Sequence, residues 1–119
     1  IMNFGSYFKN LRKSKHITQQ QIATAIGKSK MLVSGVETNK NAPFIDEDLK
    51  FIVDVLSLSE EEERKLYKEA AKARGKLPKY LLDYLTESDE AYNLLEMCAK
   101  KNLGKDSLVR IMQIMEECN

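Results

Sequence analysis

The sequence is poor in the residues on which metal sites, disulfide scaffolds and histidine chemistry depend. It contains no tryptophan, two cysteines and a single histidine, His16. Cys98 and Cys118 are far apart, and no C-x-x-C pair or Cys/His cluster accompanies them. We therefore expect no metal ion and no cofactor. Cys98 is expected to be a small buried side chain and Cys118 a thiol near a helix end, in the reducing cytoplasm.

Long apolar segments and catalytic motifs are missing as well. No run comes near the roughly 18 apolar residues of a membrane-spanning helix, so no membrane is expected among the partners. The chain has neither a G-x-S-x-G motif nor a phosphate-binding loop. His16 follows a predicted helix, where capping or simple exposure is the ordinary role. We therefore expect that the protein is not an enzyme.

The net charge of +1 conceals an uneven distribution. Residues 1–43 carry seven Lys and Arg against one acid, Glu37, whereas residues 44–119 carry 12 Lys and Arg against 17 acids. The first part is therefore strongly basic and the second acidic. A basic N-terminal segment of this kind favours a polyanionic partner, although chance on a lysine-rich surface would give the same count.

Apolar residues recur every three or four positions along the chain, which is the period of an α-helix, and strand signals are almost absent. This pattern predicts eight helices. The first runs from Phe4 to about Lys15, the fifth from Ser59 to about Arg74, and the last two cover about 89–101 and 106–117. A fourth helix is expected to start at Asp46 or a neighbour.

Residues with strong helix-end preferences stand between these periodic segments. Ser and Thr side chains satisfy the free N–H groups at a helix start, and Gly or Asn adopts the left-handed conformation at a helix end. The predicted starts are Thr18, Ser29 and the Ser59–Glu62 capping box, and the predicted ends are Gly27, Asn39 and Gly75. The segment "RGKLP", residues 74–78, is the one plausible seam between domains.

Residues 18–39 form two short helices joined by a glycine turn, after a longer first helix. That order describes a helix-turn-helix. The second of the two short helices would present Ser29, Lys30, Ser34 and Gly35 outward. A major groove is about 12 Å wide, so a helix that enters it needs small or polar residues on its outer face.

The segment "LRKSKHITQQQIATAIGKSKMLVSGVETNKNAP", residues 11–43, resembles the Cro/C1-type helix-turn-helix family, also called the XRE or lambda-repressor-like family. The shared positions are Thr18-Gln19, Ala23, Ile26-Gly27 and Ser34–Asn39, with Asn39 in place of the usual Gly. The resemblance implies an all-α fold: a five-helix lambda-repressor-like DNA-binding domain over residues 1–75, followed by a short C-terminal helical extension over residues 76–119.

The resemblance also implies roles for individual residues toward double-stranded DNA. Gln19 would bind a backbone phosphate, and Arg12 and Glu37 would form a salt bridge between the first and third helices. Gly35 departs from the longer polar side chain that the family often has. The other expected DNA-binding residues are Lys28 and Ser29 at the helix-three entrance, Lys30, Met31 and Ser34 toward base edges, and Lys40 and Asn41 in the following loop.

These inferences predict a sequence-specific transcriptional regulator, a bacterial or phage repressor that binds an operator as a homodimer. The alternative is an antitoxin-like module that neutralises a protein partner through its C-terminal helices and autoregulates its operon. The C-terminal region can either bury its apolar residues in its own helical cluster or use part of them to pair two chains. Those residues are Leu81, Leu82, Leu85, Leu94, Leu95, Leu108, Ile111, Met112 and Met115.

Overall fold

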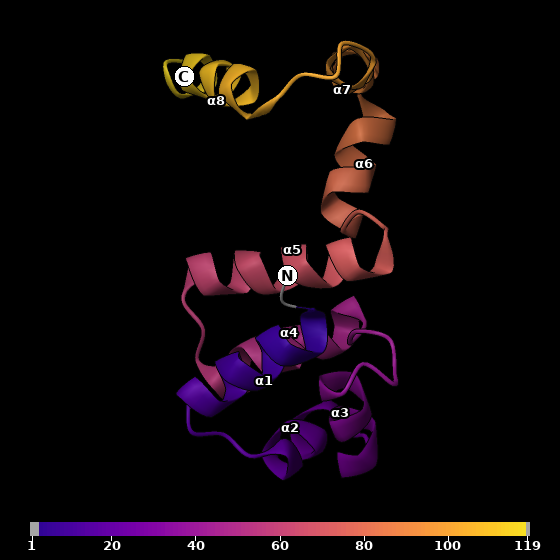
Figure 1. Ribbon diagram of the computed structural model, residues 1–119, viewed down its shortest axis with the longest axis vertical. Helices are drawn as coiled ribbons and strands as arrows, with labels where there is room; N and C mark the ends of the chain where they lie inside the picture. Colours follow the sequence, from indigo (N-terminus) through magenta and orange to yellow (C-terminus); the bar gives the residue numbers. More distant parts are fainter. Residues whose placement is uncertain (1–2, 119) are drawn as a thin grey trace. The chain divides into compact units, whose positions relative to one another are not determined.

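The computed structural model describes residues 3–118, and within that range the fold consists of helices without any strand (Figure 1). The expectation of an all-α fold is confirmed. The chain divides into two compact units after Pro78. The helices are α1 (Phe4–Ser14), α2 (Gln19–Ile26), α3 (Lys30–Glu37), α4 (Asp46–Leu56), α5 (Glu60–Arg74), α6 (Lys79–Glu87), α7 (Asp89–Lys100) and α8 (Lys105–Glu116).

The ends of α2 and α3 follow the local chemistry of the sequence. Thr18 Oγ1 accepts the N–H of Gln21 at 3.1 Å, and Gln21 Oε1 accepts the N–H of Thr18 at 2.8 Å, which makes a capping box. Gly27 ends α2 in the left-handed region, with φ 67°. Ser29 Oγ then accepts the N–H of Leu32 and starts α3. The two helices are therefore held at a short turn.

The ends of α4 and α5 differ from each other. α5 has the expected capping box between Ser59 and Glu62 and ends at Gly75. α4 begins after Ile45, which offers no capping side chain. Its first turn instead contains three acids, beginning with Asp46, whose negative charge suits the positive end of the helix dipole.

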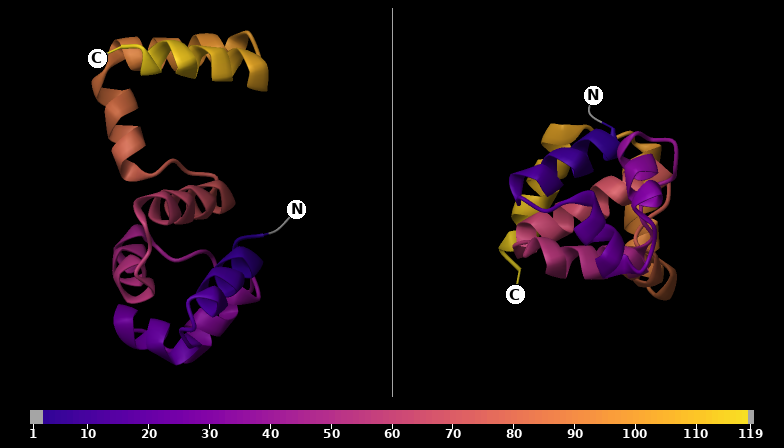
Figure 2. Two further views of the ribbon diagram at one scale, coloured as in Figure 1. Left: turned by 90° about the vertical axis from the view of Figure 1, so that its left-hand side faces the viewer. Right: turned by 90° about the horizontal axis from the view of Figure 1, so that it is seen from below.

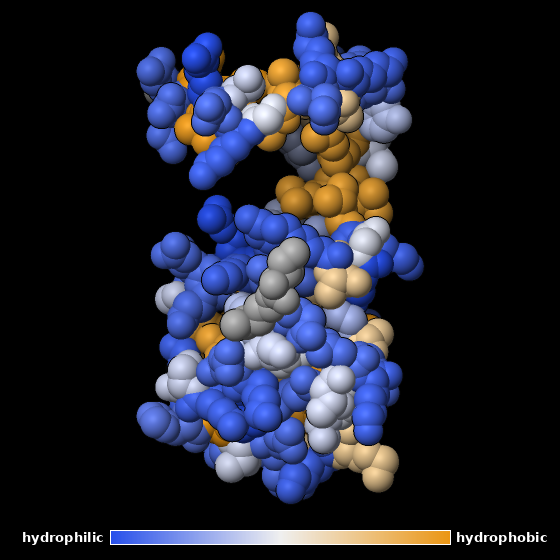
Figure 3. Space-filling model, viewed as in Figure 1, coloured by the Kyte–Doolittle hydropathy of each residue, from blue (hydrophilic) through white to orange (hydrophobic). Residues whose placement is uncertain are grey.

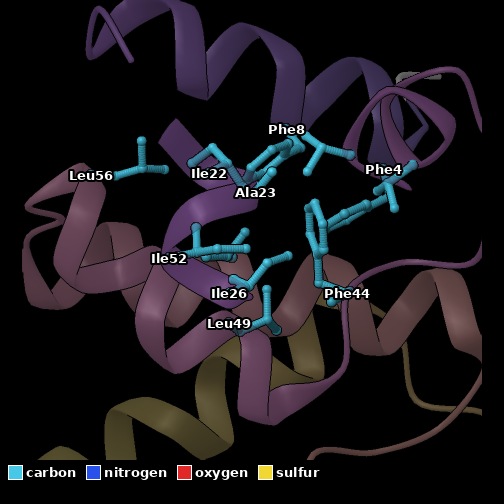
Figure 4. Packing of buried hydrophobic residues seen from close by; sticks show 13 residues of the cluster. Phe4, Phe8, Ile22, Ala23, Ile26, Phe44, Leu49, Ile52 and Leu56 are labelled. Atoms are coloured by element: carbon cyan, nitrogen blue, oxygen red, sulfur yellow. The ribbon is translucent and has the colours of Figure 1, made fainter. Parts of the chain in front are cut away.

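The core of the first unit is built from buried residues of α1–α5 and of the loop that carries Phe44; Figure 4 labels those from α1, α2, α4 and this loop. The Phe8 and Phe44 rings meet edge to face with centroids 4.8 Å apart. α2 packs against α3 and α4, while α1 packs against α3 and α5. α5 lies on the opposite side of this unit from α2 and α3 (Figures 1 and 2). The fully buried large side chains are Phe8, Ile22, Val33, Val36, Leu49, Ile52, Leu56 and Leu66.

A close approach of α1 to the end of α3 fixes the position of α3. A Cβ atom on Gly5 would come within 2.5 Å of the Glu37 carbonyl oxygen, so only glycine fits there. Asn39 adopts a left-handed conformation, with φ 61°, and its Oδ1 accepts the N–H of Gly5 at 3.1 Å. Asn39 therefore ends the third helix and also ties it to the first.

The second unit buries far less than the first. α6 packs against α7, but no described residue of α6, α7 or α8 is buried. Figure 3 shows exposed apolar side chains over α6. Within residues 3–118, Cys98 is half-buried rather than buried and Cys118 is exposed, so the packing expected for Cys98 is incomplete.

Candidate nucleic-acid interface

Arg12 of α1 and Glu37 of α3 form a buried ion pair. Arg12 Nε lies 2.6 Å from Glu37 Oε2 and Nη2 lies 3.0 Å from Oε1, so both oxygens are held in a two-pronged contact. The two residues are 8% and 5% exposed. Because a buried charge without a partner is costly, each residue holds the other in place, and α1 is fixed against α3.

The same pair reaches α2 and the chain that precedes it. Arg12 Nη1 donates to the Ile17 carbonyl oxygen at 2.8 Å, and Gln19 Nε2 donates to Glu37 Oε1 at 3.0 Å. The side-chain amide of Gln19, which the resemblance assigned to a phosphate, is thus engaged with a carboxylate. Its place in the first turn of α2 leaves its backbone N–H at the positive end of the helix dipole.

Burial of Glu37 determines the charge of the surface around it. Glu37 is the only Asp or Glu before Asp46 in the sequence. Because its charge is buried against Arg12, the exposed charges that α1, α2, α3 and the following loop contribute are all positive. Four exposed lysines there form no ion pair with any residue among 3–118: Lys9, Lys13, Lys30 and Lys40.

Two other lysines of this basic segment are paired with acids from later helices. Lys28 Nζ lies 2.6 Å from Oδ2 of Asp48 in α4, and Lys15 Nζ lies 3.0 Å from Oε2 of Glu62 in α5. Lys28 was expected at the entrance to α3, and it is there, but its ammonium group is turned to α4. Its ion pair fixes the turn between α2 and α3 against the core.

The outer face of α3 carries a row of exposed side chains. Met31 is 82% exposed, the highest value of any large apolar residue in the described chain. Lys30 and Ser29 are exposed beside it, and Ser34 is half-buried one turn further on. A flexible apolar side chain fully in water on an otherwise polar face is suited to contact with a surface that offers methyl groups.

Gly35 is small for a reason that the sequence did not reveal. A Cβ atom there would overlap the side-chain amide of Asn41, which folds back over α3 and donates from Nδ2 to the Leu32 carbonyl oxygen at 3.3 Å. Gly35 lies with Met31 and Ser34 at the outer side of α3, where the exposed side chain of Asn41 covers it. Lys40 remains exposed beside this loop.

Two shallow hollows border α3. One is lined by residues of its outer face and of the loop after it, among them Met31, Ser34, Lys40 and Asn41. The other lies where the end of α1 and the start of α2 approach Lys30, and it adds Lys13, His16 and Gln20 to the residues expected. Periodicity would have placed Lys13 and Gln20 on exposed faces, but nothing in the sequence brings them beside Lys30.

Comparison with known proteins identifies the helix-turn-helix formed by α2 and α3. Residues 8–61 match the family model described as helix-turn-helix, which is the Cro/C1-type family. No curated protein and no solved structure matches the chain significantly. Within the described residues, no helix is long and apolar enough to cross a membrane. The matched family is one of DNA-binding transcription regulators and is not typically enzymatic. Over residues 8–61, the chain is therefore similar to the Cro/C1-type (XRE) helix-turn-helix family, a family of DNA-binding transcription regulators.

Proposed function

We propose that the protein is a sequence-specific repressor that binds an operator as a dimer, with α3 in the major groove. The observation that carries the proposal is the surface of α1–α3, on which the only carboxylate is buried against Arg12. A polyanion approaching this surface meets exposed lysines and no exposed acid from these helices. Met31 and Ser34 lie on the outer face of the same helix, where base edges would be read.

Phosphate contacts would supply most of the affinity. Lys13 and Lys30 border the hollow at the start of α2, where the free N–H of Gln19 and the helix dipole also favour an anion. Lys40 would contact the phosphate backbone beyond the other end of α3. Each phosphate neutralised releases counterions, so affinity should fall steeply as salt increases.

Specificity would come from the few side chains that reach base edges, chiefly Lys30, Met31 and Ser34. A two-fold dimer would place two copies of α3 roughly 34 Å apart, one helical turn of DNA. A dimer bound in this way covers its operator and excludes polymerase, so repression needs no catalytic group.

The proposal is tested by incubating the full chain with fragmented genomic DNA from its source near physiological salt and sequencing what stays bound. Enrichment of one motif with two-fold symmetry is expected. Lys30→Ala should weaken binding to that motif. Lys68→Ala is the matched control, because Lys68 is an exposed lysine of α5 on the other side of the unit. Equal binding of all fragments by the wild type, or equal loss in both variants, would contradict the proposal.

A further inference from the structure

The second unit exposes an unusual amount of apolar surface. Its described residues, 79–118, contain 13 large apolar side chains that are exposed, whereas residues 3–78 contain four. None of the residues of α6, α7 and α8 is buried. A helical unit of about 40 residues with no buried side chain cannot offset the entropy of ordering its chain. Another surface must therefore cover it.

The apolar residues of α7 and α8 lie in two matching stripes. Each helix has four apolar residues spaced i, i+3, i+4 and i+7, which places them on one face. The faces directly opposite the stripes are polar, while Tyr92 and Met97 on α7 and Val109 and Ile114 on α8 are exposed beside the stripes. Among the described residues, α8 packs extensively along neither α6 nor α7. The stripes are Ala91, Leu94, Leu95 and Cys98 on α7, and Leu108, Ile111, Met112 and Met115 on α8.

Charged residues at the edges of these stripes are arranged with opposite signs at opposite ends. At 3.6 residues per turn, Lys105 and Glu116 flank the α8 stripe on the same side, Lys105 at the start of the helix and Glu116 at its end. Glu90 and Lys101 flank the α7 stripe in the same way with the signs exchanged. Two antiparallel copies of either helix would bring unlike charges together at both ends.

We propose that a second copy of this chain covers the two stripes across a two-fold axis. α8 lies antiparallel to the partner's α8, with Lys105 of each chain beside Glu116 of the other. An interface on a two-fold axis must be self-complementary, so that a contact from residue i to residue j is repeated from j to i. The edge charges of both helices meet that condition. A surface that binds an unrelated protein does not have to be self-complementary.

The requirement for a dimer rests on the proposed function, which this inference deepens. Dimerisation itself is measured on the protein alone, without DNA. Sedimentation equilibrium of the full chain should give twice the mass of one chain. Met112→Glu places a carboxylate in the centre of the α8 stripe and should raise the dimer dissociation constant roughly a hundredfold or more. Met112 is 53% exposed, so the change does not disturb the protomer.

Gln113→Glu is the matched control, because it adds the same charge at the next residue on the opposite, polar face of α8. It should leave the dissociation constant within about twofold of the wild-type value, since exposed charges contribute little. A chain that stays monomeric, a monomer that binds only a different protein, or a dimer that survives Met112→Glu would each overturn the inference.

Charge exchange tests the antiparallel arrangement itself. Lys105→Glu and Glu116→Lys should each weaken the dimer several-fold, because each puts two pairs of like charges in contact. The double variant should return to near the wild-type dissociation constant. Failure of the double variant to recover would overturn the arrangement. Dimers that form as described but bind no DNA would overturn only the function proposed above. Monomers that bind DNA would overturn this inference and the dimeric part of the proposed function, but not DNA binding itself.

Discussion

Arg12 and Glu37 face each other inside the first unit, with Nε 2.6 Å from Oε2 and Nη2 3.0 Å from Oε1. The pair connects α1 to α3, and it removes the only carboxylate of the first 45 residues from the surface. One contact therefore has two effects. It holds the third helix in position, and it leaves the surface that surrounds this helix without negative charge of its own.

Removing one member of this pair should lower the free energy of unfolding much more than removing both. Arg12→Leu leaves Glu37 buried without its guanidinium, and we expect the free energy of unfolding to fall by about 3–5 kcal/mol. The double variant Arg12→Leu, Glu37→Leu should recover most of that loss, because no buried charge remains. Urea unfolding of the variants measures both quantities. A single variant within about 1 kcal/mol of wild type would contradict the role assigned to the pair.

Two helical glycines should respond differently to the same substitution. At Gly5, a Cβ atom would meet the carbonyl oxygens of Glu37 and Val36 at 2.5 and 2.6 Å, and backbone cannot move cheaply. Gly5→Ala should therefore lower the free energy of unfolding by about 1–3 kcal/mol, even though alanine is the better helix former.

Gly35→Ala is the comparison, because the atoms in its way belong to the exposed side chain of Asn41. That side chain can turn aside. The loss of its hydrogen bond to Leu32, worth about 1 kcal/mol, offsets a similar gain in helix propensity. The free energy of unfolding should stay within about 1 kcal/mol of wild type. A larger loss at Gly35 than at Gly5 would show that the approach of α1 to α3 is looser than described.

The parts of the fold that depend on local chemistry could be predicted from the sequence. Thr18, Gly27, Ser29 and the Ser59 capping box mark helix ends through hydrogen bonds or backbone conformations within a few residues. The Arg12–Glu37 pair was predicted through a family resemblance, because no local sequence pattern links two residues that are 25 positions apart.

The remaining features depend on tertiary contacts that no local pattern encodes. The overlap of Asn41 with Gly35 arises from a loop that folds back, and the Lys28–Asp48 pair from the packing of α4 beside the turn. For the C-terminal helices, periodicity alone does not distinguish burial within the cluster from pairing of two chains. The exposure of their apolar stripes depends on tertiary packing, and it is the observation from which pairing of two chains is proposed above.

Tyr7 should make stability depend on alkaline pH. Burial of the ring, followed by the nearby carboxylates of Glu69 and Glu62, raises the pKa of Tyr7 to about 12 from its ordinary value of 10.0. The folded state therefore holds the phenol proton more tightly than the unfolded state does. The stabilisation from Tyr7 is complete below pH 10 and is lost as pH rises toward 12.

Urea unfolding between these pH values should show that wild type loses more free energy of unfolding than Tyr7→Phe, which has no phenol to ionise. Both proteins share all other titrating groups, so the difference belongs to Tyr7. Parallel pH profiles for the two proteins would contradict the pKa assigned to this side chain.

Replacing Lys28 should mainly lower stability, whereas replacing Lys30 should mainly weaken DNA binding. Lys28→Ala leaves Asp48, which is 7% exposed, without its partner, and should lower the free energy of unfolding by about 1–2 kcal/mol. Lys30→Ala breaks no ion pair, so stability should hardly change. On DNA the order should reverse: Lys30→Ala should reduce the slope of log affinity against log salt by about one, and Lys28→Ala by less. Equal effects of both variants on the slope would show that Lys28 leaves Asp48 when DNA binds.

Met31 should read a thymine methyl group in the operator. Its side chain is 82% exposed on the outer face of α3, and the C5-methyl of thymine is the main apolar group that the major groove offers. Replacing the contacted thymine by uracil removes only that methyl. Burial of one methyl contributes about 0.8 kcal/mol, so affinity should fall about fourfold per half-site. Scanning each operator thymine in this way, with fluorescence anisotropy as the readout, would find the position.

Met31→Ala should bind more weakly and should no longer distinguish uracil from thymine at that position. Lys30→Ala is the control on the same helix: it should also bind more weakly, but it should keep the fourfold response because its Met31 is intact. If no thymine gives the response in wild type, Met31 contacts DNA elsewhere or not at all. If Met31→Ala keeps the response, another side chain of α3 reads the methyl, and Ser34 on the same face is then the residue to change.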